Sequence, residues 1–108
     1  CGTVLWEVAV IWARLLDANA LPWSTETLCD RRVLELGSGC GVAGMAFSLR
    51  GARVTFTDLP ALVPHLEANV RRNLGPGTSN PRCNFDVVGL DWSTEYPVRL
   101  ADVAVDLV

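Results

Sequence analysis

The chain has 108 residues, half of them hydrophobic, which is enough to build the packed core of one domain. Its net charge of −3 at pH 7 and its pI of about 4.9 weigh against a nucleic-acid partner, because such proteins normally present a basic face. No apolar stretch has the length of a membrane span and no signal peptide is recognisable, so no membrane association is expected.

The four cysteines are Cys1, Cys29, Cys40 and Cys83. They show neither the C-x-x-C spacing of metal sites nor the density of a disulfide scaffold. We therefore expect free thiols, no metal site, and a protein of the reducing cytoplasm or nucleus.

An amphipathic helix is predicted from about Thr3 to Ala18, ending before Pro22, because apolar residues recur there at intervals of three and four. The expected stripe consists of Leu5, Val8, Ala9, Trp12, Leu15 and Leu16. Trp12 belongs to the stripe and is expected in the core. Trp6 lies off it, shortly after Gly2, and is a candidate lid over a cofactor pocket.

A short strand, Val33–Leu36, leads into a glycine-rich turn. The glycines are Gly37, Gly39, Gly41 and, at the start of the next helix, Gly44. Glycine tolerates positive φ and lets a backbone approach a ligand closely, which favours a nucleotide-like cofactor. The last three also fit the dinucleotide pattern G-x-G-x-x-G, so the glycines alone do not identify the cofactor. Glu35 favours a cofactor with a cationic amino acid moiety, because an anionic pyrophosphate gains nothing from a carboxylate.

Helices and strands alternate through the rest of the chain. The predicted helices are Val42 to about Leu49, ended by Gly51, and a second one marked by Leu62, Leu66, Val70 and Leu74; the predicted strands are Arg53–Thr57, Phe85–Gly89 and the start of a fourth at Val103–Val108, with a surface loop at Gly75–Arg82. This alternation predicts a Rossmann-like α/β fold with a parallel sheet. We expect the Val33–Leu36 strand at its centre, between Arg53–Thr57 and Val103–Val108.

Three further candidate residues follow the second and third strands, at the edge where α/β sheets bind ligands. Asp58 has the position of an acid that accepts ribose hydroxyls, although an aspartate before Leu-Pro also suits a turn. Trp92 suits either stacking on an adenine or core packing, and Asp91 beside it can accept from an adenine amino group. His65 is expected on the solvated side of its helix, and no residue qualifies as a general base.

These motifs together resemble methyltransferase family 16, the class I S-adenosylmethionine (SAM) dependent protein lysine methyltransferases of the methyltransferase-like 21 and calmodulin-lysine methyltransferase type. The resemblance rests on five motifs: Gly2-x-x-x-Trp6, Glu35-Leu-Gly-Ser-Gly-Cys-Gly-Val-Ala-Gly44, Val54-Thr-Phe-Thr-Asp-Leu-Pro60, Asn69-Val-x-x-Asn73 and Leu90-Asp-Trp92. The glycine motif occurs across class I methyltransferases, whereas the other motifs are more particular.

The resemblance implies SAM as the cofactor and a protein lysine as the acceptor of an in-line methyl transfer. It also implies a set of cofactor-binding residues. Glu35, Gly37 and Gly39 would line the methionine side, with Gly41 in the same turn; Asp58 would bind the ribose, Asp91 and Trp92 the adenine side, and Trp6 would close over the cofactor.

Two other functions remain open: a NAD-binding oxidoreductase and a non-catalytic Rossmann-like binding module. Family members carry an Asp-x-x-Tyr type motif after the fourth strand, a position that would fall beyond Val108. We therefore expect residues 1–108 to form a single SAM-binding domain, truncated before the C-terminal strands.

Overall fold

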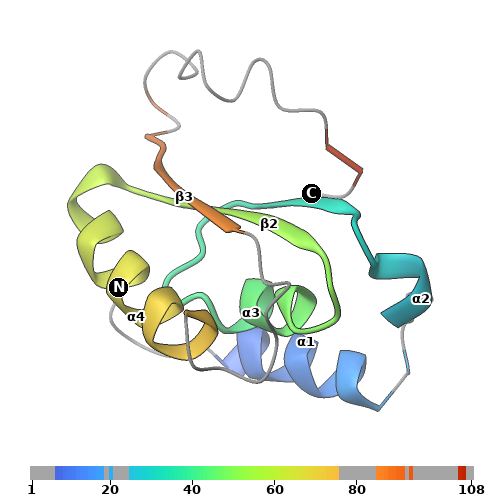
Figure 1. The fold of residues 1–108 in the computed structure, drawn as a ribbon. Helices are drawn as coiled ribbons and strands as arrows, with labels where there is room; N and C mark the ends of the chain where they lie inside the picture. Colours follow the sequence, from blue (N-terminus) through green and yellow to red (C-terminus); the bar gives the residue numbers. More distant parts are fainter. Residues whose placement is uncertain are drawn as a thin grey trace.

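The described residues form a parallel three-stranded sheet with helices packed on one of its faces (Figure 1). The computed structural model describes residues 7–18, 20, 25–75, 85–91, 93 and 105–106. The elements in chain order are α1 (Glu7–Asp17), α2 (Thr25–Leu28), β1 (Arg32–Glu35), α3 (Val42–Ser48), β2 (Arg53–Asp58), a 3-10 turn (Pro60–Leu62), α4 (Val63–Leu74) and β3 (Phe85–Gly89). The predicted α/β class with a parallel sheet is confirmed.

The strands lie in the order β1-β2-β3 and are all parallel. Val33 of β1 is opposite Val54 of β2, which in turn is opposite Phe85 of β3. Alternate residues on each strand therefore face the helices, while Arg53 and Asp86 on the other face are exposed. The predicted strand at Phe85–Gly89 has the observed bounds, and β1 and β2 differ from prediction by one residue at their ends.

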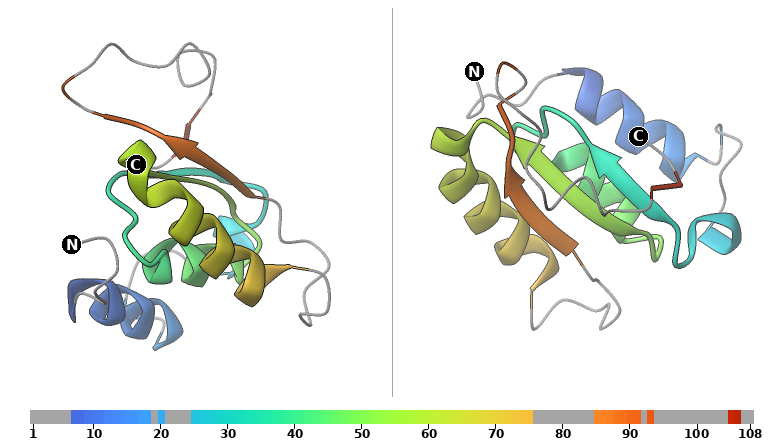
Figure 2. Two further views of the ribbon diagram at one scale, coloured as in Figure 1. Left: turned by 90° about the vertical axis from the view of Figure 1, so that its left-hand side faces the viewer. Right: turned by 90° about the horizontal axis from the view of Figure 1, so that it is seen from above.

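The core lies between the sheet and helices α3 and α4, which Figure 2 shows on the same side of the strands. Phe56 at the middle of β2 is fully buried and meets the ring of Phe85 edge-on, with ring centroids 6.2 Å apart. Leu66 and Val70 of α4 are also fully buried. The apolar face predicted for α4 is thus confirmed, and this face packs the helix into the core beside β3 and α3.

The core position predicted for Trp12 on the first helix is wrong. Among the described residues of the predicted stripe only Leu16 is fully buried, while Val8 is 63%, Leu15 37% and Trp12 38% exposed. The cause is tertiary, because α1 packs against α3 rather than across the sheet (Figure 1) and a helix partner covers only a narrow strip. No helix in the described part of the chain is long and apolar enough to cross a membrane.

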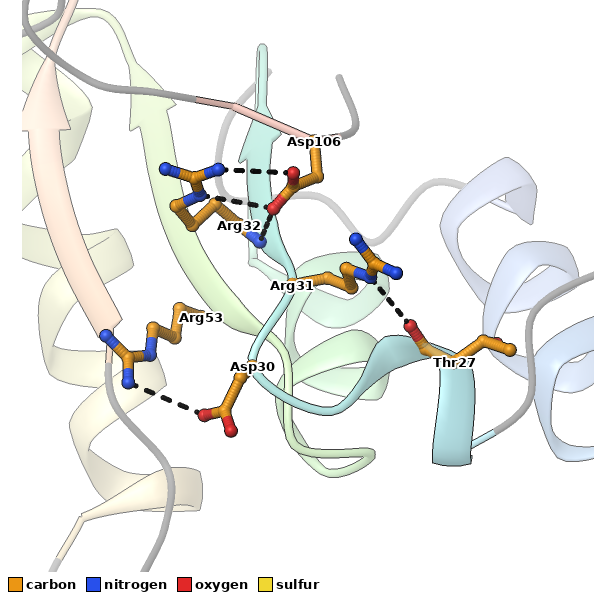
Figure 3. Close-up of polar contacts among 6 residues, drawn as sticks. All are labelled: Thr27, Asp30, Arg31, Arg32, Arg53 and Asp106. Atoms are coloured by element: carbon orange, nitrogen blue, oxygen red, sulfur yellow. Dashed lines mark hydrogen bonds and ion pairs between the residues drawn. The ribbon is translucent and has the colours of Figure 1, made fainter.

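The edge of β1 that faces away from β2 contacts residue 106, as Figure 3 shows. The backbone N–H of Asp106 donates to the carbonyl of Arg32 at 2.8 Å, and the Arg32 backbone N–H donates to Asp106 Oδ2 at 2.8 Å. Within the described sheet β1 is an edge strand and β2 the central one. The predicted fourth strand is described only at Val105 and Asp106, so a central position for β1 stays a prediction.

Candidate functional site

The glycine turn follows β1 in an unusual backbone conformation. Gly37, Gly39 and Gly41 have φ angles of 65°, 57° and 82°, in the left-handed region that disfavours residues with a Cβ. A Cβ built on Gly39 would meet no atom of the described residues within 4 Å. The turn thus has the left-handed backbone predicted from its glycines.

Hydrogen bonds fasten this turn to the end of β2. The N–H of Ser38 donates to the carbonyl of Thr57 at 2.8 Å, and the N–H of Thr57 donates to Ser38 Oγ at 3.1 Å. The buried hydroxyl of Thr57 donates to the carbonyl of Glu35 at 2.7 Å. The first strand and its turn are therefore held in register with the strand that carries Asp58.

Glu35 lies beneath the turn, with its carboxylate largely buried. Its Oε1 accepts a hydrogen bond from the backbone N–H of Gly44 at 3.1 Å, while Oε2 is buried with no hydrogen-bond partner among the described residues. Burial raises the pKa of Glu35 above its ordinary value, and hydrogen bonds from Ser38 and Gly44 oppose this only in part. A buried carboxylate in this state gains from an adjacent cation.

Asp58, at the end of β2, binds the backbone of the turn directly. Its Oδ2 accepts from the N–H of Gly39 at 2.7 Å, and its Oδ1 accepts from the N–H of Leu59 at 2.8 Å. Sequence reasoning assigned Asp58 to the ribose and missed its role in holding the turn. Each carboxylate oxygen can accept more than one hydrogen bond, so the two roles are compatible.

Asp91 is brought to the same edge of the sheet because β3 ends beside β2. The N–H of Leu90 donates to the carbonyl of Asp58 at 2.8 Å, which fixes the start of the segment after β3. Asp91 Oδ1 accepts from the N–H and the hydroxyl of Ser93, at 2.9 and 2.6 Å. These bonds lower the pKa of Asp91, so its carboxylate is ionised at neutral pH.

Gly44 has a packing role that differs from that of the turn glycines. A Cβ at Gly44 would lie 2.4 Å from Cε1 of Phe56 and 2.6 Å from Oε2 of Glu35. No side chain fits there, and this close approach lets α3 begin directly against the Glu35 carboxylate.

Helix α4 contributes a site residue that sequence reasoning did not find. The side-chain amide of Asn69 donates from Nδ2 to the carbonyl of Cys40, inside the glycine turn. The spacing of Asn69 and Asn73 suggests only a polar helix edge, and nothing local shows that this edge faces a turn 29 positions away.

The remaining residues named from the sequence are two tryptophans, one histidine and the cysteines. Trp6 and Trp92 lie outside the described residues, so their predicted contacts with the cofactor stay predictions. His65 is exposed, as expected. Cys29 is a free thiol, and the described residues contain no cluster of metal-ligating side chains.

The described residues fit a SAM-like cofactor on two structural observations. No described residue would contact a Cβ on Gly39, and Glu35 offers a buried carboxylate oxygen without a hydrogen-bond partner among the described residues. Glu35 and Asp58 end β1 and β2, and Asp91 follows the end of the adjacent β3. This is the edge at which open α/β sheets bind nucleotide-like ligands.

The chain belongs to the lysine methyltransferase family, whose pattern matches residues 1–108. It is 39% identical over 72 residues to bovine protein-lysine methyltransferase METTL21E, an alignment that covers 67% of this chain and 24% of the bovine protein. It is 43% identical over 110 residues to mouse EEF1A lysine methyltransferase 3, covering 91% of this chain and 45% of the mouse protein. A zebrafish protein N-lysine methyltransferase METTL21A is 36% identical over 76 residues, covering 70% and 33%. The chain thus spans less than half the length of these curated relatives.

Proposed function

We propose that this protein is a SAM-dependent protein-lysine N-methyltransferase. The observation that carries the proposal is the match of the lysine methyltransferase family to the whole chain. The parallel sheet with a left-handed glycine turn after β1 supports it, because such a turn lets a nucleotide-like cofactor approach the backbone. We further propose that the sheet is the amino-terminal, cofactor-binding part of a Rossmann-like class I methyltransferase fold.

Each carboxylate has a distinct role in this proposal. Glu35 faces the cationic amino acid end of the cofactor, because its buried oxygen has no hydrogen-bond partner among the described residues and its burial favours a neighbouring positive charge. Asp58 accepts from the ribose hydroxyls while holding the N–H of Gly39. Asp91, with Trp92 beside it, contacts the adenine side, and Trp6 closes over the pocket.

The bound cofactor supplies a methyl group on a positively charged sulfur, ready for transfer to a nucleophile. The protein's task is then alignment, because oriented reactants lose most of the entropic barrier. The rigid connection of the turn to β2 and α4 serves that alignment. The acceptor amine of a lysine must lose its proton before it reacts, and no described residue is assigned as its base.

Titration with S-adenosylhomocysteine and with NADH tests the cofactor assignment against the oxidoreductase alternative. We expect binding of the first and none of the second, since a carboxylate beneath the turn disfavours a pyrophosphate. Thiol labelling followed by peptide mapping provides a second, independent measure of binding, because labelling of two cysteines is compared within the same sample. S-adenosylhomocysteine should protect Cys40 in the turn and leave the exposed Cys29 as reactive as before.

Methyl transfer from radiolabelled SAM distinguishes an enzyme from a non-catalytic binding module. Purified EEF1A is the first acceptor to test, because a relative with 43% identity is named for its lysine. Label on a lysine of the acceptor supports the proposal, whereas cofactor binding without transfer to any protein substrate favours the binding module. We also propose residence in the cytoplasm or nucleus, which the free thiol of Cys29 supports.

A further inference from the structure

Asn69 connects helix α4 to the glycine turn through a bond of defined direction. Its side chain is half-buried, and Nδ2 donates to the carbonyl oxygen of Cys40. A carbonyl only accepts, so the nitrogen end of the amide must face the turn. The side-chain amide of Asn73, one helical turn later, donates to the backbone carbonyl of Asn69 at 2.8 Å and, more weakly, to the side-chain Oδ1 of Asn69 at 3.5 Å. The orientation of the Asn69 amide is thus set from both ends.

Two peptide groups of the turn are hydrogen-bonded at both ends, one of them through Asn69. In the Cys40–Gly41 peptide, the carbonyl accepts a hydrogen bond from the Asn69 side chain, and the Gly41 N–H donates to the carbonyl of Ser38 at 2.8 Å. The peptide between Ser38 and Gly39 is also bound at both ends, because the Gly39 N–H donates to Asp58 at 2.7 Å. Glycines with positive φ have few steric limits, so these directed bonds fix the turn.

Apolar contacts from the same helix cannot replace this bond. A Cβ on Gly41 would lie 3.1 Å from both Leu66 Cδ1 and Val70 Cγ2, which shows that α4 packs closely against the turn. Such contacts hold the helix near the turn but are non-directional, so they do not determine which way a peptide plane faces. The hydrogen bond from the amide of Asn69 to the Cys40 carbonyl, by contrast, has a defined direction.

We propose that Asn69 is a positioning residue for cofactor binding, acting through the Cys40 carbonyl without touching the cofactor itself. This inference rests on the proposed function, in which the turn receives SAM. With the bond present, the turn is already in its binding conformation. Without it, the peptide must be ordered when the cofactor arrives, which weakens affinity.

Calorimetric titration of the full-length protein with S-adenosylhomocysteine tests the role of Asn69. We expect Asn69→Ala to raise Kd about fivefold, the equivalent of one neutral hydrogen bond. Asn69→Asp should raise Kd at least as much, because it places an oxygen against the Cys40 carbonyl. Asn69→Gln keeps a donor and should bind more tightly than the aspartate variant. If Asn69 acted only by packing, Asn69→Asp would raise Kd less than Asn69→Ala, since aspartate is nearly isosteric with asparagine.

Two variants of α4 serve as matched controls. Arg72→Ala, at an exposed position of α4, should leave Kd unchanged. Asn73→Ala should raise Kd less than Asn69→Ala, because the donor to Cys40 remains. Thermal unfolding shows whether each variant is folded. If Asn69→Ala does not fold, the comparison of Kd between Asn69→Gln and Asn69→Asp tests the inference instead.

A wild-type protein that fails to bind S-adenosylhomocysteine overturns the proposed function together with the inference. Tight binding by Asn69→Asp, equal to wild type, overturns the inference alone.

Discussion

Individual carboxylates at this site have more than one task. Asp58 accepts two backbone hydrogen bonds, from Gly39 and Leu59, and is thereby part of the scaffold of the turn. Glu35 accepts from Gly44 and keeps its second oxygen buried. Both therefore affect the stability of the site as well as its affinity, and their variants must be examined for both.

Asp58→Ala should weaken SAM binding by about 1.5–3 kcal/mol, the usual loss for hydrogen bonds to a charged group. The physical reason is twofold, because the variant removes an acceptor for the cofactor and releases the N–H of Gly39. Calorimetry on the full-length protein measures the change. Asp86→Ala, at an exposed position of β3, is the matched control and should bind normally. An unchanged dissociation constant in a folded Asp58→Ala protein would remove Asp58 from the site.

The stability of Glu35→Gln relative to that of wild type should increase as the pH rises. Burial raises the pKa of Glu35 in the folded state, so the contribution of this group to stability is present below its unfolded pKa and is lost as the pH rises through the folded pKa. Glutamine does not titrate. Urea unfolding of both proteins at about pH 4 and about pH 7.5 measures the difference, which should favour the variant more at the higher pH. A stability difference that does not change with pH would contradict a raised pKa for Glu35. The variant is also expected to lose affinity for the cofactor.

At the scale of elements, burial separates α4 from α1. Both helices carry apolar residues at helical spacing, but α4 buries its stripe against the sheet and the glycine turn. α1 meets α3 through a narrower strip, and only Leu16 reaches the core among the described residues of its predicted stripe. The periodicity of a helix thus indicates which side is apolar, whereas the neighbouring element decides how much of it is covered.

Leu16→Ala should lower the free energy of unfolding by about 2–5 kcal/mol, because it leaves a cavity in the core. Ile11→Ala, on the same helix but 54% exposed, should cost less than about 1 kcal/mol. Chemical denaturation of the two variants gives the comparison. Equal losses at the two positions would show that a partner covers the outer face of α1 in solution.

At the scale of the whole molecule, helices α3 and α4 cover one face of the sheet, and an ion pair connects distant parts of the chain. Arg32 Nε and Asp106 Oδ2 are 3.1 Å apart, and a second bond joins Arg32 Nη2 to Oδ1 at 3.3 Å (Figure 3). Arg32 begins β1, so this pair fixes residue 106 beside the edge of that strand.

Asp106→Asn should reduce stability near neutral pH and have progressively less effect in acid. The Arg32 side chain and backbone lower the pKa of Asp106 from 3.8 to about 2. Its contribution to stability is therefore present above the unfolded pKa and is lost as the pH falls through the folded value. Unfolding of wild type and variant at about pH 6 and about pH 2.5 measures this, and added salt should shrink the difference because the pair is partly exposed. A difference that persists unchanged in acid would exclude the ion pair as its cause.

The sequence alone was sufficient for the order of the described strands and longer helices and for the family, but not for the short helix α2. The apolar runs and the glycine spacing predict the described strands within one residue at their ends, because strand burial and turn conformation are encoded locally in residue type. Glu35 and Asp58 are recognisable for the same reason as carboxylates near the carboxyl ends of strands. Only the tertiary structure shows that Asp58 holds Gly39, that Asn69 holds Cys40 and that Trp12 is partly exposed. Each of these depends on which segments meet in space, and contacts between residues 19 or 29 positions apart leave no periodic signal in the chain.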